Sequence, residues 1–143
     1  MRIAPYIRKA QYHETDRMGI VHHANYIKWF EEARVDFMEK IGISYDRMEN
    51  MGIISPVLTV SCDYKTSTNF NDDVCVAVKV VFFNGIRLVL DYQVTDAASG
   101  DLRATGSSSH CFLTKEFRPI NLKKTKPDIY DIFFFALSED EQE

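Results

Sequence analysis

An acid, a glycine and two adjacent histidines fall within eight positions in the stretch "DRMGIVHHANY", residues 16–26. Asp16 supplies a carboxylate that could activate water or attack a carbonyl carbon. Gly19 tolerates the positive φ that a sharp bend needs, although an ordinary turn glycine needs the same property. The stretch therefore predicts either a hydrolytic site or a polar turn in which Asp16 bonds its own backbone.

The two histidines lie where a helix is expected to begin. The first N–H groups of a helix lack partners, and the helix dipole favours negative charge there. The N–H of His23 is therefore a candidate donor to the oxyanion of a carbonyl under attack, whereas His22 is expected only to pack. Because His13 and His110 lie on separate predicted elements, we expect neither a metal site nor an organic cofactor.

The motifs that are missing narrow the chemistry. The chain has no G-x-S-x-G nucleophile elbow and no glycine-rich phosphate loop. A thioester fits this pattern, because a thiolate whose conjugate acid has a pKa of about 8.5 leaves without a strong general acid.

Composition favours one globular domain over residues 1–143, with 45% hydrophobic and 27% charged residues. The net charge of −4 is concentrated in the acidic tail 139–143, which we expect to be disordered. A near-neutral body argues against nucleic acid as a partner. With no signal peptide and no membrane span, we expect a cytoplasmic protein. The three widely spaced cysteines are interpreted as buried free thiols: Cys62, Cys75 and Cys111.

Hydrophobic periodicity predicts the elements that position the motif. Apolar residues at helical spacing indicate an amphipathic helix over residues 26–41 that stops at Gly42. Period-two patterns predict strands near 3–11, 58–65, 74–80, 86–94 and 102–114, and a last helix is expected near 126–137. Short turns require antiparallel neighbours, so the fold class is α+β, with one helix on a curved antiparallel sheet. Small residues in 104–109 would let a helix approach closely.

The stretch "YHETDRMGIVHHANYIKWFEEAR" resembles the signature of the hotdog-fold acyl-CoA thioesterases, in the 4-hydroxybenzoyl-CoA thioesterase and YbgC-like branch. The end of the last strand, "TKEFRPINL", is also similar. Relatives often carry a proline within the stretch that is "YKTSTNFNDD" here, near the acyl pocket, and this chain has none there. The positions that carry the resemblance are Asp16, Gly19, Ile20, Val21, Asn25, Tyr26 and Glu31.

The resemblance implies a five-stranded hotdog sheet and hydrolysis of an acyl-CoA or acyl carrier protein thioester. Asp16 would be the general base or nucleophile, with the His23 N–H as oxyanion donor and Gly19 at the bend. Glu31 is a further catalytic candidate, or a solvated helix acid that pairs with Arg34. The substrate-binding candidates are His22, Asn25, Tyr26, Arg87, Lys115 and Arg118, the last three as cations for the phosphates of coenzyme A.

The resemblance also implies a homodimer or a homotetramer built as a dimer of dimers, with sites at the dimer interface. Edge strands that pair across a two-fold axis would protect their backbone groups, and the apolar segment "IYDIFFFAL" at 129–137 should dock on the same or a neighbouring subunit. Two alternatives stay open: a hotdog dehydratase or hydratase that relies on a histidine, and a non-catalytic acyl-thioester binder.

Overall fold

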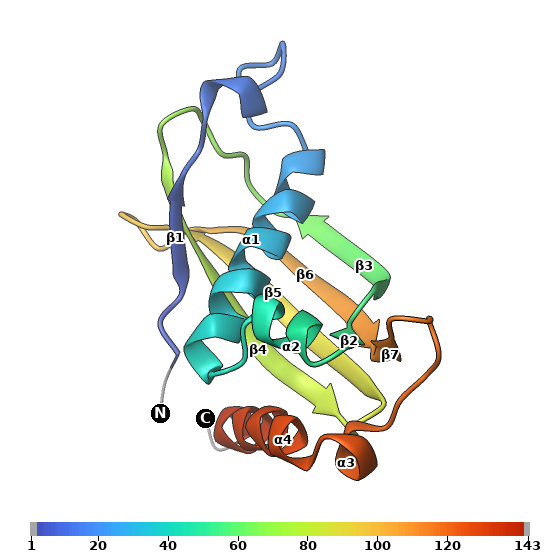
Figure 1. Cartoon of the computed structure of the whole chain (residues 1–143). Coiled ribbons are helices and arrows are strands. Elements are labelled where there is room, and N and C mark those ends of the chain that lie inside the picture. The colour runs from blue at the N-terminus through green and yellow to red at the C-terminus, as the bar shows by residue number, and fades with distance from the viewer. Residues whose placement is uncertain (1–2, 142–143) are drawn as a thin grey trace.

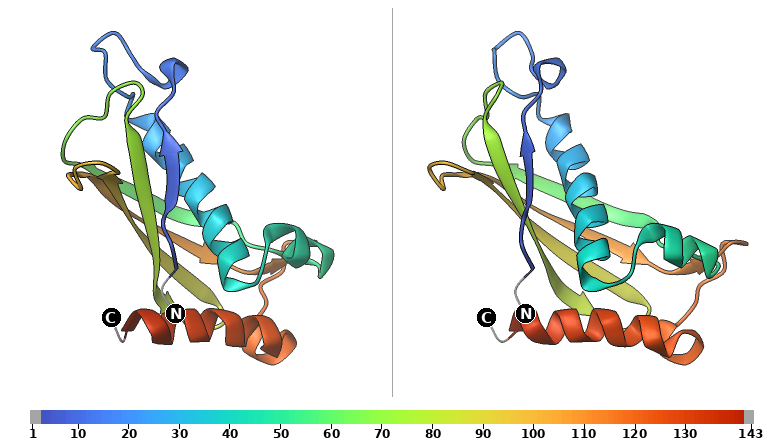
Figure 2. Two further views of the ribbon diagram at one scale, coloured as in Figure 1. Left: turned by 90° about the vertical axis from the view of Figure 1, so that its left-hand side faces the viewer. Right: turned by 60° about the vertical axis from the view of Figure 1, so that its left-hand side comes forward.

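The computed structural model describes residues 3–141, with side-chain surroundings as far as Leu137. A long helix, α1 (Ala24–Ile41), lies on one face of a five-stranded antiparallel sheet (Figure 1). The side views show the other face of the sheet open, and a second helix crossing one end of the sheet (Figure 2). The predicted α+β class is confirmed.

The sheet has the strand order β1-β4-β5-β6-β3. This order corrects one expectation, because β3 does not pair with β4, the next strand along the chain. It crosses instead to the opposite edge and pairs with β6, with Val57 opposite His110 and Tyr64 opposite Ala104. The strands are β1 (Tyr6–Lys9), β3 (Val57–Tyr64), β4 (Asp73–Phe83), β5 (Arg87–Asp96) and β6 (Leu102–Cys111).

Helix α1 ends as predicted. Gly42 has a φ of 105°, and its N–H bonds the carbonyl oxygens of Met38 and Glu39, which closes the last turn. The predicted apolar face is buried on the sheet, led by Trp29, Phe30 and Ala33.

Gly106 on β6 allows this close packing. A Cβ at Gly106 would clash with the ring of Phe30 and lie 2.7 Å from the carbonyl oxygen of Ser61. Phe30 also stacks on Tyr92 with the ring centroids 4.5 Å apart. The small residues predicted to admit a helix therefore do so at this position.

Helix α4 (Pro127–Glu141) crosses the end of the sheet and packs on β4 through Ile129 and Phe133, while Phe134 and Phe135 remain exposed. The docking expected of the apolar C-terminal segment thus occurs within the chain. The helix includes residues 139–141 of the tail expected to be disordered, because glutamate-rich segments propagate helix well. Residues 142–143 lie outside the described part.

Several short elements were not predicted, because they are too short for a periodic pattern. They are η1 (Tyr12–Glu14), α2 (Tyr45–Asn50), β2 (Ile53–Ile54) and α3 (Leu122–Thr125). The strand predicted over 102–114 is divided into β6 and a separate β7 (Leu113–Thr114). Strands β2 and β7 pair with each other and place residues 113–119 beside the start of β3. All three cysteines are free, and they are half-buried rather than buried.

Strand β3 is exposed along almost its whole length. Val57, Leu58 and Val60 each expose more than two-fifths of their surface, and one backbone edge of the strand has no neighbour in the sheet. Helix α1 leaves this edge strand largely uncovered. The chain thus presents an apolar, unpaired edge.

Candidate active site

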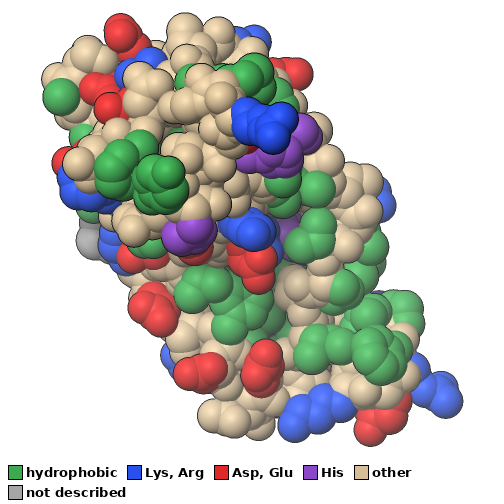
Figure 3. Space-filling view, turned by 90° about the horizontal axis from the view of Figure 1, so that it is seen from above, with side chains coloured by type: hydrophobic (Ala, Val, Ile, Leu, Met, Phe, Trp, Pro, Cys, Tyr) green, Lys and Arg blue, Asp and Glu red, His purple; other side chains and the backbone are tan. Residues whose placement is uncertain are grey.

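A cavity of about 270 Å³ opens where the loop before α1 meets the end of β3. Seen from above, this end of the molecule exposes hydrophobic side chains beside histidines (Figure 3). Asp16 and His23 both line the cavity, as the motif predicted. The other lining residues are Met18, Ile20, Val21, Tyr26, Tyr64, Lys65, Thr66 and Ser67.

Asp16 is held by a tight turn. Its Oδ1 accepts a hydrogen bond from the Met18 N–H at 2.8 Å, and its carbonyl oxygen accepts one from the Gly19 N–H at 3.0 Å. Gly19 has a φ of 81°, the left-handed conformation that the sequence predicted. Oδ2 of Asp16 has no partner among the described residues, so one carboxylate oxygen remains free to meet water or a thioester carbon.

The start of α1 separates the roles of the two histidines. His22 Nδ1 accepts a hydrogen bond from the Ala24 N–H at 3.2 Å, so its imidazole caps the helix, whereas the sequence suggested packing or a contact with substrate. The His23 N–H has no partner among residues 3–141. The two rings lie 4.1 Å apart, centroid to centroid. Of the two, only the His23 backbone offers an unused donor beside Asp16.

Glu14 anchors this loop from inside and was not anticipated. Its carboxylate accepts hydrogen bonds from Arg8 at 2.6 Å, the Gln11 N–H at 2.8 Å and Trp29 Nε1 at 2.8 Å, and the residue is 3% exposed. Burial opposes its charge, but these donors outweigh burial and lower the pKa of Glu14. No local pattern reveals this network, because its members come from β1, η1 and α1.

The carbonyl oxygen of Glu14 positions the helix start. It accepts the His22 N–H at 2.8 Å and the Asn25 side-chain amide at 2.8 Å. Asn25 was predicted to bind substrate, but its side-chain amide donates a hydrogen bond within the fold. Tyr26 is buried, bonds Thr68 through its hydroxyl at 2.9 Å and contributes to the cavity wall.

Glu31 does not meet Asp16 in this chain. It lies on the exposed side of α1, in a groove with Lys28 and Glu32. The expected pairing of Glu31 with Arg34 is wrong, because Arg34 is buried and donates instead to the hydroxyls of Tyr45 and Tyr92.

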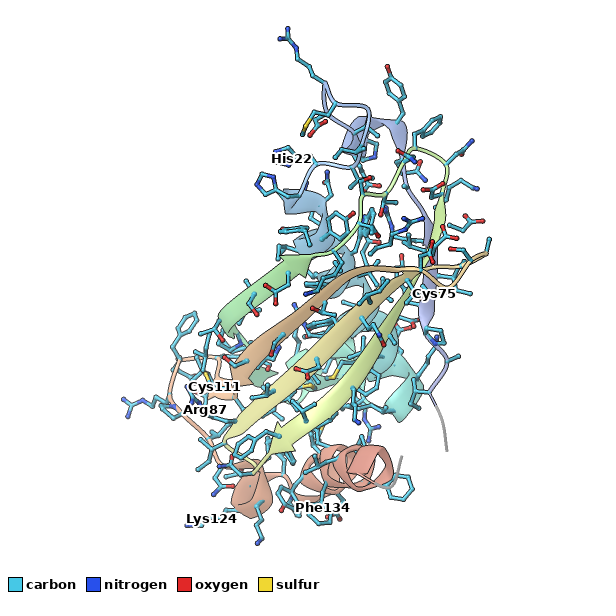
Figure 4. The ribbon with its side chains drawn as sticks, turned by 180° about the vertical axis from the view of Figure 1, so that it is seen from behind. His22, Cys75, Arg87, Cys111, Lys124 and Phe134 are labelled. Carbon is cyan, nitrogen blue, oxygen red and sulfur yellow. The ribbon has the colours of Figure 1, made fainter. Side chains whose placement is uncertain are left out.

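The predicted phosphate-binding cations lie far from Asp16. His22 marks one end of the molecule, while Arg87 and Lys124 lie at the other end (Figure 4). Lys115 and Arg118 belong to the turn that follows β7 and are exposed at that far end. Among the lining residues the cation is Lys65, which was not predicted because it lies on the polar side of a period-two pattern.

The described part of the chain holds no group of three histidine, cysteine, aspartate or glutamate side chains placed to bind a metal ion. Among the helices of residues 3–141, none is both long and apolar enough to cross a membrane.

The chain belongs to the thioesterase-like superfamily, which it matches over residues 10–129. It is 36% identical over 121 residues to the putative acyl-CoA thioesterase YneP of Bacillus subtilis, covering 84% of this chain and 87% of that one. It superposes on the DHNA-CoA thioesterase of Staphylococcus aureus with a TM-score of 0.90 at 34% identity, covering 97% and 93% of the two chains. A hypothetical protein of Thermus thermophilus gives 0.86 at 30%, covering 94% and 99%.

These likenesses confirm the predicted family, the hotdog fold and the predicted class of enzyme, a hydrolase of acyl-CoA thioesters.

Proposed function

We propose that the cavity at Asp16 is the site where this chain hydrolyses an acyl-CoA thioester. The observation that carries the proposal is that one cavity is lined by Asp16, which has a free carboxylate oxygen, and by His23, whose N–H has no partner among the described residues. Asp16 activates water, or attacks the thioester carbon itself, and the His23 N–H stabilises the oxyanion that forms. The thiolate then leaves without a strong general acid.

An aromatic acyl group suits this cavity best. Its walls include the rings of Tyr26 and Tyr64, which meet edge to face with centroids 5.2 Å apart. The relative from Staphylococcus aureus is named for a DHNA-CoA substrate. The stretch 64–73, which lacks the proline common in relatives, supplies Tyr64, Lys65, Thr66 and Ser67 to the wall, and we propose that it selects the acyl group.

The chain works as a homodimer in this proposal, joined through β3. The exposed apolar edge of β3 supports this, since a two-fold axis across the strand would pair it with its twin. The eight residues of β3 span roughly 25 Å from the cavity end to the end beside residues 113–119. Antiparallel pairing brings the start of one β3 to the end of the other.

In the proposed dimer, the predicted phosphate-binding cations of one chain would lie near Asp16 of the other chain. Lys115 and Arg118, on the turn beside the start of β3, would approach the cavity of the partner rather than their own. The nucleotide phosphates of coenzyme A would then be bound across the interface by these cations and Arg87. We also propose that two such dimers can form a tetramer and that acyl carrier protein can replace coenzyme A as the carrier. A cytoplasmic location is proposed as well, and the three free cysteines support it.

The experiment is a panel of aromatic and aliphatic acyl-CoA substrates, assayed with a thiol-detecting reagent on wild-type protein and on Asp16→Asn. Asparagine keeps the hydrogen bond to Met18 but cannot act as a base, so kcat should fall by at least ~10² with little change in thermal stability. Asp91→Asn, on the exposed face of β5, is the control and should match wild type. Near-normal turnover by Asp16→Asn would contradict the assignment.

A further inference from the structure

The peptide group between His23 and Ala24 is held from both sides. Its carbonyl oxygen accepts hydrogen bonds from the Tyr64 hydroxyl at 2.9 Å and, more weakly, from the Tyr26 N–H at 3.3 Å, and its N–H donates to His22 Nδ1 at 3.2 Å. The preceding peptide is also held, because the His22 carbonyl oxygen accepts the Asn25 N–H at 3.0 Å. The His23 N–H belongs to the His22–His23 peptide. Because this peptide and the next one are both held by hydrogen bonds, the N–H of His23 keeps one direction.

Only one of these contacts comes from outside the helix start. Tyr64 lies on β3, 41 residues from His23 in the sequence, whereas the other partners lie within residues 22–26. Its ring also packs against the rings of Tyr26 and His23, with centroid separations of 5.2 and 6.1 Å. Tyr64 therefore ties the helix start to the sheet at the edge of the cavity.

The phenol of Tyr64 is suited to a donor role. Burial raises its pKa to about 12, with further contributions from the thiol of Cys62 and from Tyr26. The hydroxyl thus stays protonated at physiological pH and cannot serve as a base. Its proton is directed at the His23 carbonyl oxygen.

We propose that Tyr64 is a positioning residue for catalysis: by bonding the His23 carbonyl it holds the His23 N–H in the direction needed for the oxyanion. This inference rests on the proposed function of the cavity. An oxyanion donor works only when it lies about 2.7–3.1 Å from the place where charge develops. Without the Tyr64 hydroxyl, the His23–Ala24 peptide keeps only its bonds to the Tyr26 N–H and His22 Nδ1, both from within the helix start. A misdirected donor then costs rate in the transition state rather than affinity for substrate.

The test is Tyr64→Phe, which removes the hydroxyl and keeps the ring that packs on Tyr26. We expect kcat to fall about tenfold while KM stays within about twofold. The ¹⁵N–¹H resonance of the His23 amide should shift in Tyr64→Phe. Tyr12→Phe is the matched control, because Tyr12 is exposed and does not line the cavity; it should leave both readouts unchanged.

Two outcomes would overturn the inference. Wild-type kcat in Tyr64→Phe would show that the hydroxyl does not position the donor. A raised KM with unchanged kcat would instead show that the Tyr64 hydroxyl binds substrate and does not position the donor. The failure of the proposed function is seen separately, since Asp16→Asn in the same series would then keep its turnover whatever Tyr64→Phe does. Thermal unfolding of each variant excludes loss of folded protein as the cause.

Discussion

At the scale of single residues, the site depends more on backbone groups than on unusual side chains. Asp16 is directed by a left-handed glycine, and the proposed oxyanion donor is a main-chain N–H that needs no particular side chain. His22 and His23 are adjacent in the sequence, yet one caps the helix and the other lines the cavity. Their substitutions should therefore have different consequences.

We expect His22→Ala to lower the free energy of unfolding by about 1 kcal/mol, because the Ala24 N–H loses its cap. His22→Asn should recover most of this loss, since asparagine is a good capping residue. Both variants should keep measurable hydrolysis, and His23→Ala should be more damaged in kcat than His22→Ala while remaining active. Denaturant titration and steady-state kinetics measure the two effects.

Complete loss of activity in a folded His23→Ala protein would contradict the assignment of the His23 N–H as the essential group. It would mean that the imidazole itself performs the chemistry, as in a hotdog dehydratase or hydratase, and that the backbone donor is insufficient.

At the scale of elements, a buried polar chain connects α1 with β5 and β6. Arg34 donates to Tyr92, the Tyr92 hydroxyl bonds Ser108 at 2.6 Å, and Ser108 bonds His110 Nε2 at 2.8 Å. His110 is 1% exposed. Burial, and then the charge of Arg34, lower the pKa of His110 to about 4. The folded protein therefore keeps this imidazole neutral.

This network predicts loss of stability in mild acid. Between pH 6.5 and about 4 the unfolded chain binds a proton at His110 that the folded chain excludes, so the free energy of unfolding falls as pH falls, by up to about 3 kcal/mol. His110→Asn should flatten the pH dependence of the unfolding midpoint in this window. His13→Asn, at an exposed position, should not. Equal slopes for the two variants would contradict the assignment.

At the scale of the whole molecule, the placement of charge and edge argues for a site shared by two chains. Asp16 and the turn with Lys115 and Arg118 lie at opposite ends of β3, and that strand carries the unpaired apolar edge. Light scattering should give a mass of twice the chain or a multiple of it. A fully active monomer at working concentration would contradict the proposed dimer.

Mixed dimers test the shared site directly. Asp16→Asn should be nearly inactive, and Lys115→Glu/Arg118→Glu should be weak at low substrate concentration. When the two variants are co-expressed, half of the dimers are mixed and each mixed dimer has one intact site, so about a quarter of wild-type activity should return. Mixing the purified variants without exchange of chains is the control. No recovery in verified mixed dimers would place each site within one chain.

The long helix and its glycine stop, the strand segments and the turn at Asp16 before a helix start could all be predicted from the sequence. These features follow from local rules: apolar periodicity, left-handed glycines and unpartnered N–H groups at a helix end. The family signature lies within one continuous stretch, so it could also be recognised in the sequence.

The contacts between residues far apart in the sequence could not be predicted in this way. Strand β3 lies at the far edge of the sheet beside β6, and Arg34 is buried away from Glu31. Glu14 bonds Arg8 and Trp29 behind the loop, and the Tyr64 hydroxyl bonds the His23 carbonyl oxygen. Such contacts join segments far apart in the chain, and their partners are chosen by packing and by the need to satisfy buried polar groups, which no local pattern of residues records.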